Sequence, residues 1–243
     1  LEYCRANNIV PNYTTSGFNL TAEEVQLTKE NCGAVAVSEY RNEHTLRALK
    51  MFIDAGCKTN IHYVLGNFSI DEAIDKLENK SFTKGVNAVI FLLSKPVGLG
   101  YEDDVLKAGD PKVKRFFELI DEGDQPVKLG FDSCSVPGLL NYTSKIDKNS
   151  LDTCEGGRFS MYISADMIAT TCSFNQAGKW AYDLKNVAGE FVGTIKDAWD
   201  SEKFEDFRNR LRNSCGKCYN RIDCQGGCPI VPQIVLCDRN ERS

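Results

Sequence analysis

The sequence has no long hydrophobic run and only a small excess of charge of one sign. The longest apolar segment runs from Ala88 to Leu93, far short of the roughly 20 residues that a membrane-spanning helix needs. The formal net charge is −5, from 29 basic and 34 acidic residues. Nucleic-acid binding requires basic charge clustered along a phosphate track. We therefore expect neither a membrane nor a nucleic acid among the partners.

Several short functional signals are also missing. Residues Leu1 to Ile9 are polar and contain no apolar segment of the kind found in secretory signals, which predicts a cytoplasmic location. The phosphate-binding pattern G-x-x-x-x-G-K-[ST] does not occur. A Ser–His–Asp triad is defined by geometry rather than by sequence position, and the chain has only two histidines. We therefore assign no catalytic residue from the sequence.

The first half of the chain alternates between strand-like and helix-like segments. A chain of 243 residues with 42% hydrophobic residues can bury a sizeable core. Thr21 to Glu24 and Ser69 to Glu72 have the capping-box form, which predicts that a helix begins at each. Further helices are expected over 43–55, from Asp110, and near 198–211. The expected strands are 12–15, 33–37, 60–65, 86–93, 127–131 and a short one within 158–164.

This alternation predicts a parallel sheet or barrel with helices on the outside. Four or five strand–helix units are too few to close an eight-stranded barrel. The predicted fold class is therefore α/β: a partial parallel (βα) barrel over residues 1–132, followed by a small cysteine-rich domain over residues 133–243. Lys95, directly after the apolar strand, either projects a cation into the opening of the barrel or merely ends the strand.

Cysteine is the one residue type in clear excess. Eleven cysteines are present, and seven of them lie between Cys154 and Cys237. The odd total excludes complete pairing in disulfides within the chain, and clustered thiols without an export signal are more often metal ligands. Cys215 begins the spacing C-x2-C-x5-C-x3-C, and Cys237 follows it. Spacing alone leaves structural zinc, an iron–sulfur cluster and inert or cross-linked thiols open.

With Cys154 and Cys172 upstream, this pattern resembles the SPASM domain, the auxiliary-cluster extension of radical S-adenosylmethionine (radical SAM) enzymes. The family pattern is C-x(9–15)-G-x4-C, a gap, C-x2-C-x5-C-x3-C, a gap, and a last C. All seven C-terminal cysteines match it in order. Met167 stands where the family has glycine, and we expect a somewhat different turn there, because methionine adopts a positive φ less readily.

The resemblance implies two auxiliary [4Fe–4S] clusters. The first would be held by Cys215, Cys218, Cys224 and Cys237, and the second by Cys154, Cys172 and Cys228. The family often adds an eighth cysteine, but this chain has Ser160 at that position. The second cluster would therefore keep an open iron site or take another thiol, for which Cys134 is the candidate. Cys134 is equally explained as a small buried hydrophobic residue at a strand end.

The first half resembles the later strands of a radical SAM barrel, which end near Gly17, Glu39, Leu65 and Pro96. The family's C-x3-C-x2-C motif, which binds the cluster that cleaves S-adenosylmethionine, does not occur in this sequence. We therefore expect a truncated or split chain. Its unpaired edge strand would be covered by a missing N-terminal segment or by a partner chain.

The resemblance also implies a function. Ser38, Arg47 and, with a weaker match, Ser16 would contact S-adenosylmethionine in the intact family member. Ser38 is otherwise explained as a helix cap and Arg47 as a solvated helix residue. The family expectation is an oxidoreductase that modifies a peptide or protein by radical chemistry, although the missing motif leaves open whether this chain is itself an enzyme. The alternative is a non-catalytic module that binds zinc or a cluster and recognises a peptide or partner protein.

Overall fold

The computed structural model describes residues 1–175, 178–213 and 215–238. These residues divide into two compact units, which are described separately. The first comprises residues 1–93 and 122–132, and the second comprises residues 94–121 and those from 133 onward. The predicted domain division after residue 132 stays a prediction. Among the described residues, no helix combines the length and apolar character that crossing a membrane requires.

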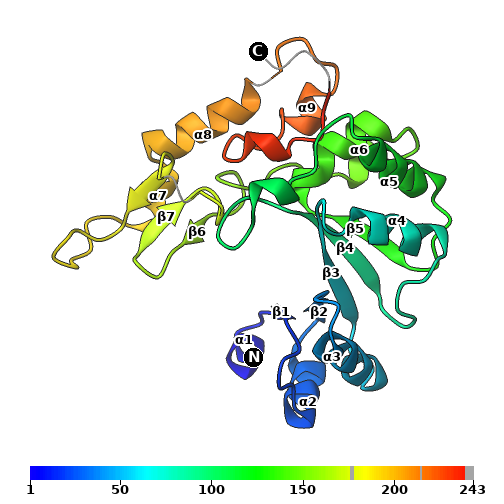
Figure 1. Ribbon diagram of the computed structural model, residues 1–243. Helices are drawn as coiled ribbons and strands as arrows, with labels where there is room; N and C mark the ends of the chain where they lie inside the picture. The colour runs from blue at the N-terminus through cyan, green and yellow to red at the C-terminus, as the bar shows by residue number, and fades with distance from the viewer. Residues whose placement is uncertain (176–177, 214, 239–243) are drawn as a thin grey trace. The chain divides into compact units, whose positions relative to one another are not determined.

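The first unit is built on a five-stranded parallel sheet (Figure 1). The strands follow one another in chain order, and each pairs with the next one in parallel, as expected when right-handed crossover helices connect neighbouring strands. They are β1 (Asn12–Thr15), β2 (Ala34–Ser38), β3 (Thr59–Leu65), β4 (Ala88–Leu93) and β5 (Lys128–Phe131). The α/β class and the parallel sheet agree with the prediction. In the described residues the sheet is open, with β1 and β5 at its edges.

The helices of this unit are α1 (Glu2–Ala6), α2 (Ala22–Asn31), α3 (Glu43–Asp54) and α4 (Ile70–Glu78). Helix α3 packs on β2 and β3 and contacts α2. One sheet face is fully buried and apolar, since Val37, Tyr63 and Phe91 are each 0% exposed. The alternate positions Asn60 and His62 lie on the opposite face and are only half-buried. The sheet therefore has one core face and one polar, partly open face.

The capping box predicted at Thr21 is present. The Thr21 side chain accepts a hydrogen bond from the Glu24 N–H, and the Glu24 carboxylate accepts one from the Thr21 N–H. The one predicted at Ser69 is wrong. Ser69 precedes α4 but makes no side-chain cap; its hydroxyl instead donates to the Val64 carbonyl at 2.8 Å and accepts from the Gly66 N–H at 2.9 Å. A buried serine beside a turn satisfies its hydroxyl with the nearest backbone groups.

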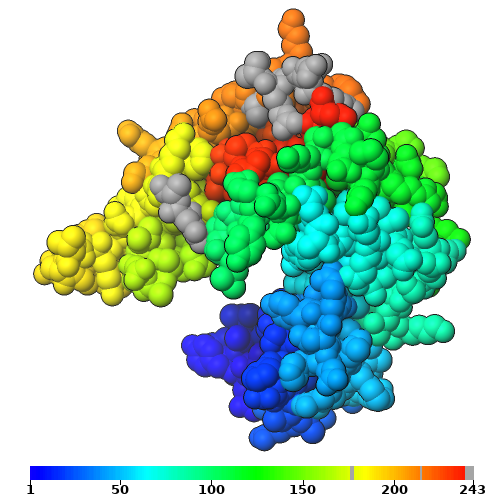
Figure 2. All heavy atoms as spheres, in the orientation of Figure 1, coloured from blue at the N-terminus to red at the C-terminus, as the bar shows by residue number. Residues whose placement is uncertain are grey.

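The second unit contains short helices and a small antiparallel sheet. Its strands are β6 (Tyr162–Ile163), β7 (Ile168–Thr170) and β8 (Ala181–Asp183). Its α-helices are α5 (Pro111–Glu122), α6 (Val136–Tyr142), α7 (Ile195–Trp199), α8 (Glu202–Arg212) and α9 (Arg221–Cys224). Its 3₁₀ turns are η1 (Glu102–Asp104), η2 (Ser133–Ser135), η3 (Lys148–Ser150) and η4 (Pro232–Ile234). The loop between β8 and α7 projects from this unit (Figure 2).

One prediction for this unit is wrong. The single helix expected near 198–211 is two helices, because Ser201 has an extended backbone and caps α8 through the Phe204 N–H. The short strand expected within 158–164 is confirmed as Tyr162–Ile163. The turn that follows holds Met167 at φ 62°. Met167 therefore adopts the same left-handed backbone conformation that glycine adopts freely, although a different turn was expected at this position.

Candidate metal centre

Four of the C-terminal cysteines gather around one cavity in the second unit. Cys215, Cys218, Cys224 and Cys237 line it together with apolar side chains that include Pro137, Leu140 and Val235. Burial raises the pKa of the Cys224 thiol to about 11, and the other three thiols add to the rise. Cysteines that are spread over 22 positions in the sequence thus share one apolar site. They are the four that the resemblance implied as the first ligand set.

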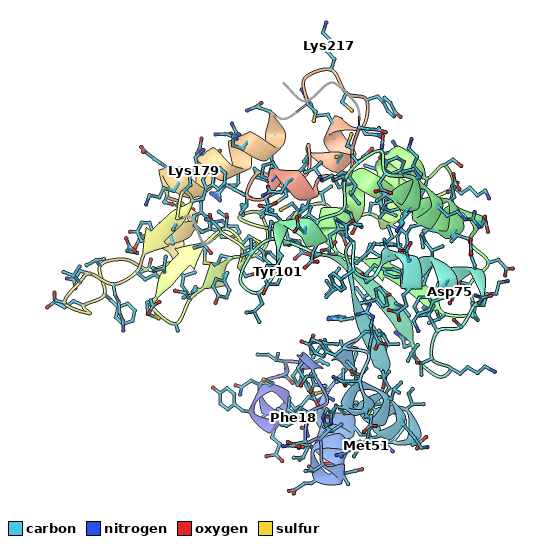
Figure 3. The ribbon with its side chains drawn as sticks, viewed as in Figure 1. Phe18, Met51, Asp75, Tyr101, Lys179 and Lys217 are labelled. Atoms are coloured by element: carbon cyan, nitrogen blue, oxygen red, sulfur yellow. The ribbon has the colours of Figure 1, made fainter. Side chains whose placement is uncertain are left out.

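The local chain conformation explains how this first group forms. The loop that carries Cys215 and Cys218 leaves the end of α8, and Lys217 projects from its tip (Figure 3). The Cys218 N–H donates to the Cys215 carbonyl at 2.9 Å, which closes a tight turn. Buried Asn220 anchors the loop by donating to the Leu140 carbonyl at 3.2 Å. Its side-chain oxygen accepts from Lys148 at 2.9 Å.

Cys154, Cys172 and Cys228 form the second group. Burial raises the pKa of Cys154 to about 11, and the Cys228 and Cys172 thiols raise it further. Burial also raises the pKa of Cys228, and Cys172 is again a contributing neighbour. Gly156 leaves room beside this group: a Cβ there would lie 2.6 Å from the Thr171 carbonyl oxygen and 3.5 Å from the Cys154 sulfur. The turn after Cys154 therefore requires glycine for close packing.

Backbone N–H groups donate to sulfur in both groups. The Val231 N–H donates to the Cys228 sulfur at 3.3 Å, and the Ile230 N–H also favours the Cys228 thiolate. The Gly156 N–H donates to the Cys154 sulfur, and the Gly226 N–H donates to the Cys224 sulfur. Such donors lower the thiol pKa against the effect of burial. They stabilise the deprotonated sulfur, which is the form that binds metals.

The donor chemistry of both groups fits iron–sulfur ligation. Thiolates in an apolar surrounding with N–H donors to sulfur are the typical environment of such clusters. Two buried polar atoms next to Cys172 have no hydrogen-bond partner in the described residues: the Thr171 hydroxyl oxygen and the Asn175 side-chain nitrogen. In the described part of the chain, however, no group of three or more His, Cys, Asp or Glu side chains is arranged so that it could hold a metal ion. The cavity of the first group has a volume of about 20 Å³.

Cys134 lies in η2 of the same unit. It packs against a buried apolar cluster formed by Val105, Val231 and Ile234, and Cys228 packs against the same cluster. Ser160, at the position of the family's eighth cysteine, is exposed. Cys134 is therefore placed near the second group, and its role as a ligand stays a prediction. The described cysteines form no disulfide.

The candidate S-adenosylmethionine contacts lie in the first unit. Ser16 directly follows β1, and Ser38 ends the neighbouring strand β2. Arg47, on α3, donates to the Leu20 carbonyl and so meets the loop that carries Ser16. Gly17 permits this approach, because a Cβ there would lie 2.4 Å from the Ala48 Cβ. The carboxyl ends of two adjacent parallel strands thus bring these polar groups to one edge of the sheet.

The explanation of Ser38 as a helix cap is wrong, because Asn42 caps α3 by accepting from the Thr45 N–H at 2.9 Å. His62 pairs with Ser38 in the sheet register and lies within hydrogen-bond distance of the Thr14 hydroxyl, 3.3 Å away. Burial lowers the pKa of His62. His62 and Thr14 line a hollow of about 260 Å³ on the polar face of β1 to β3, together with Asn12, Ala36 and Asn60 among others.

Sequence reasoning did not find Thr171 and Asn175. Their residue types are unremarkable for a turn, and no spacing rule marks them. Only the burial of Thr171 (0% exposed) and Asn175 (5% exposed), together with their unpaired polar atoms, singles them out.

No protein-family model matches the sequence, and no curated protein matches it. Solved structures do match. The anaerobic sulfatase-maturating enzyme anSMEcpe, solved with bound AdoMet, is 18% identical with a TM-score of 0.61 over 100% of this chain and 69% of its own. The same enzyme with AdoMet and the Cp18Cys peptide is equally similar over 73% of its length.

SuiB from Streptococcus suis is 15% identical with a TM-score of 0.62, over 99% of this chain and 62% of its own. At such identities the comparison establishes the fold. Both neighbours are radical SAM/SPASM peptide maturases. The chain therefore resembles, in fold and over its whole length, the radical SAM/SPASM peptide maturases.

Proposed function

We propose that this chain works as part of a radical SAM/SPASM enzyme that modifies a peptide or protein, and that its second unit holds two auxiliary [4Fe–4S] clusters. The observation that carries the proposal is the grouping of the seven C-terminal cysteines. Four of them line one apolar cavity, and the other three are mutual neighbours. A peptide substrate is supported by the neighbour anSMEcpe, which was solved with a bound peptide.

The ligands in this proposal are divided by group. Cys215, Cys218, Cys224 and Cys237 hold the first cluster. Cys154, Cys172 and Cys228 hold the second, and Cys134 is the candidate for its remaining iron, because it packs on the same apolar cluster as Cys228. A bound [4Fe–4S] cluster supplies one-electron transfer. The protein's part is to present thiolates, to donate N–H groups to their sulfurs and to exclude water with the surrounding apolar side chains.

In the first unit we propose that Ser38, Arg47 and Ser16 contact S-adenosylmethionine. The support is the position of Ser16 and Ser38 at the carboxyl ends of β1 and β2, where functional groups of parallel α/β folds gather. Arg47, on α3, donates to the Leu20 carbonyl in the loop that follows Ser16. The Arg47 guanidinium adds a positive charge there, which suits the carboxylate of an amino-acid ligand. The neighbour anSMEcpe binds AdoMet.

The test is anaerobic reconstitution with iron and sulfide. Two clusters predict about eight irons per chain, four in each cubane. In Cys218→Ala the first cluster loses a ligand, so we expect about four irons to be lost. Cys57→Ala is the matched control, because Cys57 lies in the first unit and its thiol faces the Val25 carbonyl 3.9 Å away. It should keep the full iron content.

Three outcomes contradict the proposal. Equal iron loss in both variants refutes the ligand assignment. One or two tightly held zinc ions, with no brown colour after reconstitution, identify the chain as a zinc-binding module. Thiols that remain metal-free under all these conditions refute metal binding altogether. Mössbauer spectroscopy identifies cubane clusters independently of the iron count.

A further inference from the structure

Lys95 is a lysine in an unusual place. It lies two residues after the end of β4, belongs to the second unit, and is only 8% exposed. Its ammonium lies 4.8 Å from the centre of the Phe174 ring. Burying an ammonium is unfavourable unless nearby groups compensate its charge. Lys95 thus neither points into solvent nor simply ends the strand.

The surroundings of Lys95 connect it to the second cysteine group. Phe174, on which its ammonium rests, packs against the apolar cluster of Val105, Val231 and Ile234. Cys228 packs against that same cluster. The buried ammonium of Lys95 and the thiol of Cys228 are therefore placed around the same apolar cluster, with Phe174 as the connecting side chain.

Unpaired polar groups lie on both sides of Cys172. The Thr171 hydroxyl and the Asn175 side-chain nitrogen are buried and have no partner in the described residues. The Asn175 N–H donates to the Cys172 carbonyl at 3.0 Å, closing a turn that holds Asn175 beside the cysteine. A buried donor without an acceptor is costly, and native proteins rarely keep one without a reason. An acceptor supplied by a bound group resolves it.

We propose that the Lys95 ammonium and the Asn175 carboxamide set the reduction potential of the cluster held by Cys154, Cys172 and Cys228. This inference rests on the proposed function. Reduction adds one electron, and hence one negative charge, to the cluster, with no proton and no bond made or broken. A nearby positive charge and a hydrogen bond to a cluster sulfur both stabilise the reduced form more than the oxidised form. Both groups therefore raise the potential of this cluster.

The experiment is a potentiometric titration of the reconstituted full chain with dithionite as the reductant, followed by electron paramagnetic resonance. In Lys95→Met the charge is lost while an unbranched side chain only one atom shorter is kept. We expect the potential of one cluster to fall by about 60 mV, a tenfold change in its ratio of reduced to oxidised form, and the other to stay unchanged. Lys95→Arg should restore most of the potential. Asn175→Ala should lower the same potential.

The matched control is Lys185→Met. Lys185 also lies over an aromatic ring, 4.7 Å from the centre of Phe191, but on the projecting loop between β8 and α7. Lys185 is half-buried and lies outside both cysteine groups, so this variant should leave both potentials unchanged. A comparable shift of a reduction potential in Lys185→Met would contradict the inference, because it would show that the loss of any lysine charge lowers the potential.

Iron analysis accompanies every variant. Fully loaded Lys95→Met with both potentials unchanged overturns the inference and leaves the proposed function standing. If Lys95→Met fails to load iron, Asn175→Ala decides, because unchanged potentials in that loaded variant overturn the inference as well. A wild-type chain that takes up no cluster refutes the proposed function, and the inference with it.

Discussion

Met167 shows how one residue can keep a turn that its side chain disfavours. It sits between β6 and β7 at φ 62°, where an L-residue with a Cβ is strained. Its N–H donates to the Ser164 carbonyl at 3.0 Å, and its carbonyl accepts from the Leu184 N–H at 3.0 Å. Its side chain packs on a buried cluster that contains Leu184 and Ala198. Hydrogen bonds and packing thus offset the backbone strain.

Met167→Gly should accordingly cost less stability than Met161→Gly. Both methionines pack against the same buried cluster, and both substitutions make the unfolded chain equally more flexible. Only Met167 gains relief from a left-handed backbone, which is strained by about 1–2 kcal/mol in a residue with a Cβ. We therefore expect the two free energies of unfolding, measured in urea, to differ by about that amount. An equal loss in the two variants would show that the turn at Met167 carries no strain.

Helices α2 and α4 show that one motif can have two structural outcomes. Both are preceded by a capping-box sequence, but only the Thr21 box forms. In α4 the Glu72 carboxylate bonds Arg41 instead. Burial works against ionisation of Glu72, but the hydrogen bond and charge of Arg41 outweigh it and keep its pKa below the usual range. The motif specifies a helix start, while the partner of each polar group depends on the surrounding fold.

The two helices therefore predict a difference in pH dependence. Bonds from the Thr21 backbone and side chain lower the pKa of Glu24. A lowered pKa in the folded state contributes stability above the unfolded pKa, about 4.3 for Glu, and that contribution is lost as the pH falls through the folded pKa. Thr21→Ala removes one of these bonds. Its loss of stability relative to the wild type should thus be largest at pH 7 and shrink below about pH 4.

Ser69→Ala is the control for Thr21→Ala. Ser69 bonds backbone groups and no carboxylate, so its loss of stability should not change across the same pH range. Urea unfolding at neutral and acidic pH measures both variants. If the loss in Thr21→Ala is constant with pH, the Thr21 hydroxyl does not stabilise the Glu24 carboxylate.

For the whole molecule, the two units differ in what holds them together. The first has a continuous apolar sheet face with Val37, Ile61 and Phe91 at 0–1% exposure. Apolar clusters of the second unit include three that contain three buried residues each, and Cys228 and Cys154 pack against two of these clusters. Metal ligation by these cysteines would therefore couple binding to folding in the second unit.

Cluster loading should stabilise the second unit selectively. Both tryptophans, Trp180 and Trp199, lie in it, so tryptophan fluorescence follows its unfolding alone. Binding a thousandfold beyond its dissociation constant adds about 4 kcal/mol, which corresponds to a rise in the unfolding midpoint of roughly 10 °C. Removing iron with a chelator should reverse this rise in the unfolding midpoint. Amide hydrogen exchange of β3, in the first unit, is the control and should not change. An unchanged tryptophan midpoint after full loading would refute the coupling.

Much of the fold could be predicted from short stretches of sequence. Apolar runs such as Ala88 to Leu93 form strands because a parallel strand is buried on both faces or nearly so. The Thr21 capping box and the apolar spacing of α3 set helix boundaries within a residue or two. The cysteine spacing correctly grouped Cys215, Cys218, Cys224 and Cys237, which line one cavity; metal binding there stays a prediction. All of these depend on neighbours along the chain, and the sequence records such neighbours directly.

Other features depend on contacts between distant segments, which no local pattern records. Three such features follow from packing or hydrogen bonding in the folded chain. They are the break between α7 and α8, the hydrogen bonds of the Ser69 hydroxyl to nearby backbone groups, and the left-handed backbone of Met167. The same holds for the buried Lys95 on Phe174 and the unpaired Asn175 beside Cys172. Residue types and spacing thus specify which groups are available for chemistry. Burial and long-range contacts decide which of them meet, because free energy depends on the neighbours in space and not on the distance along the chain.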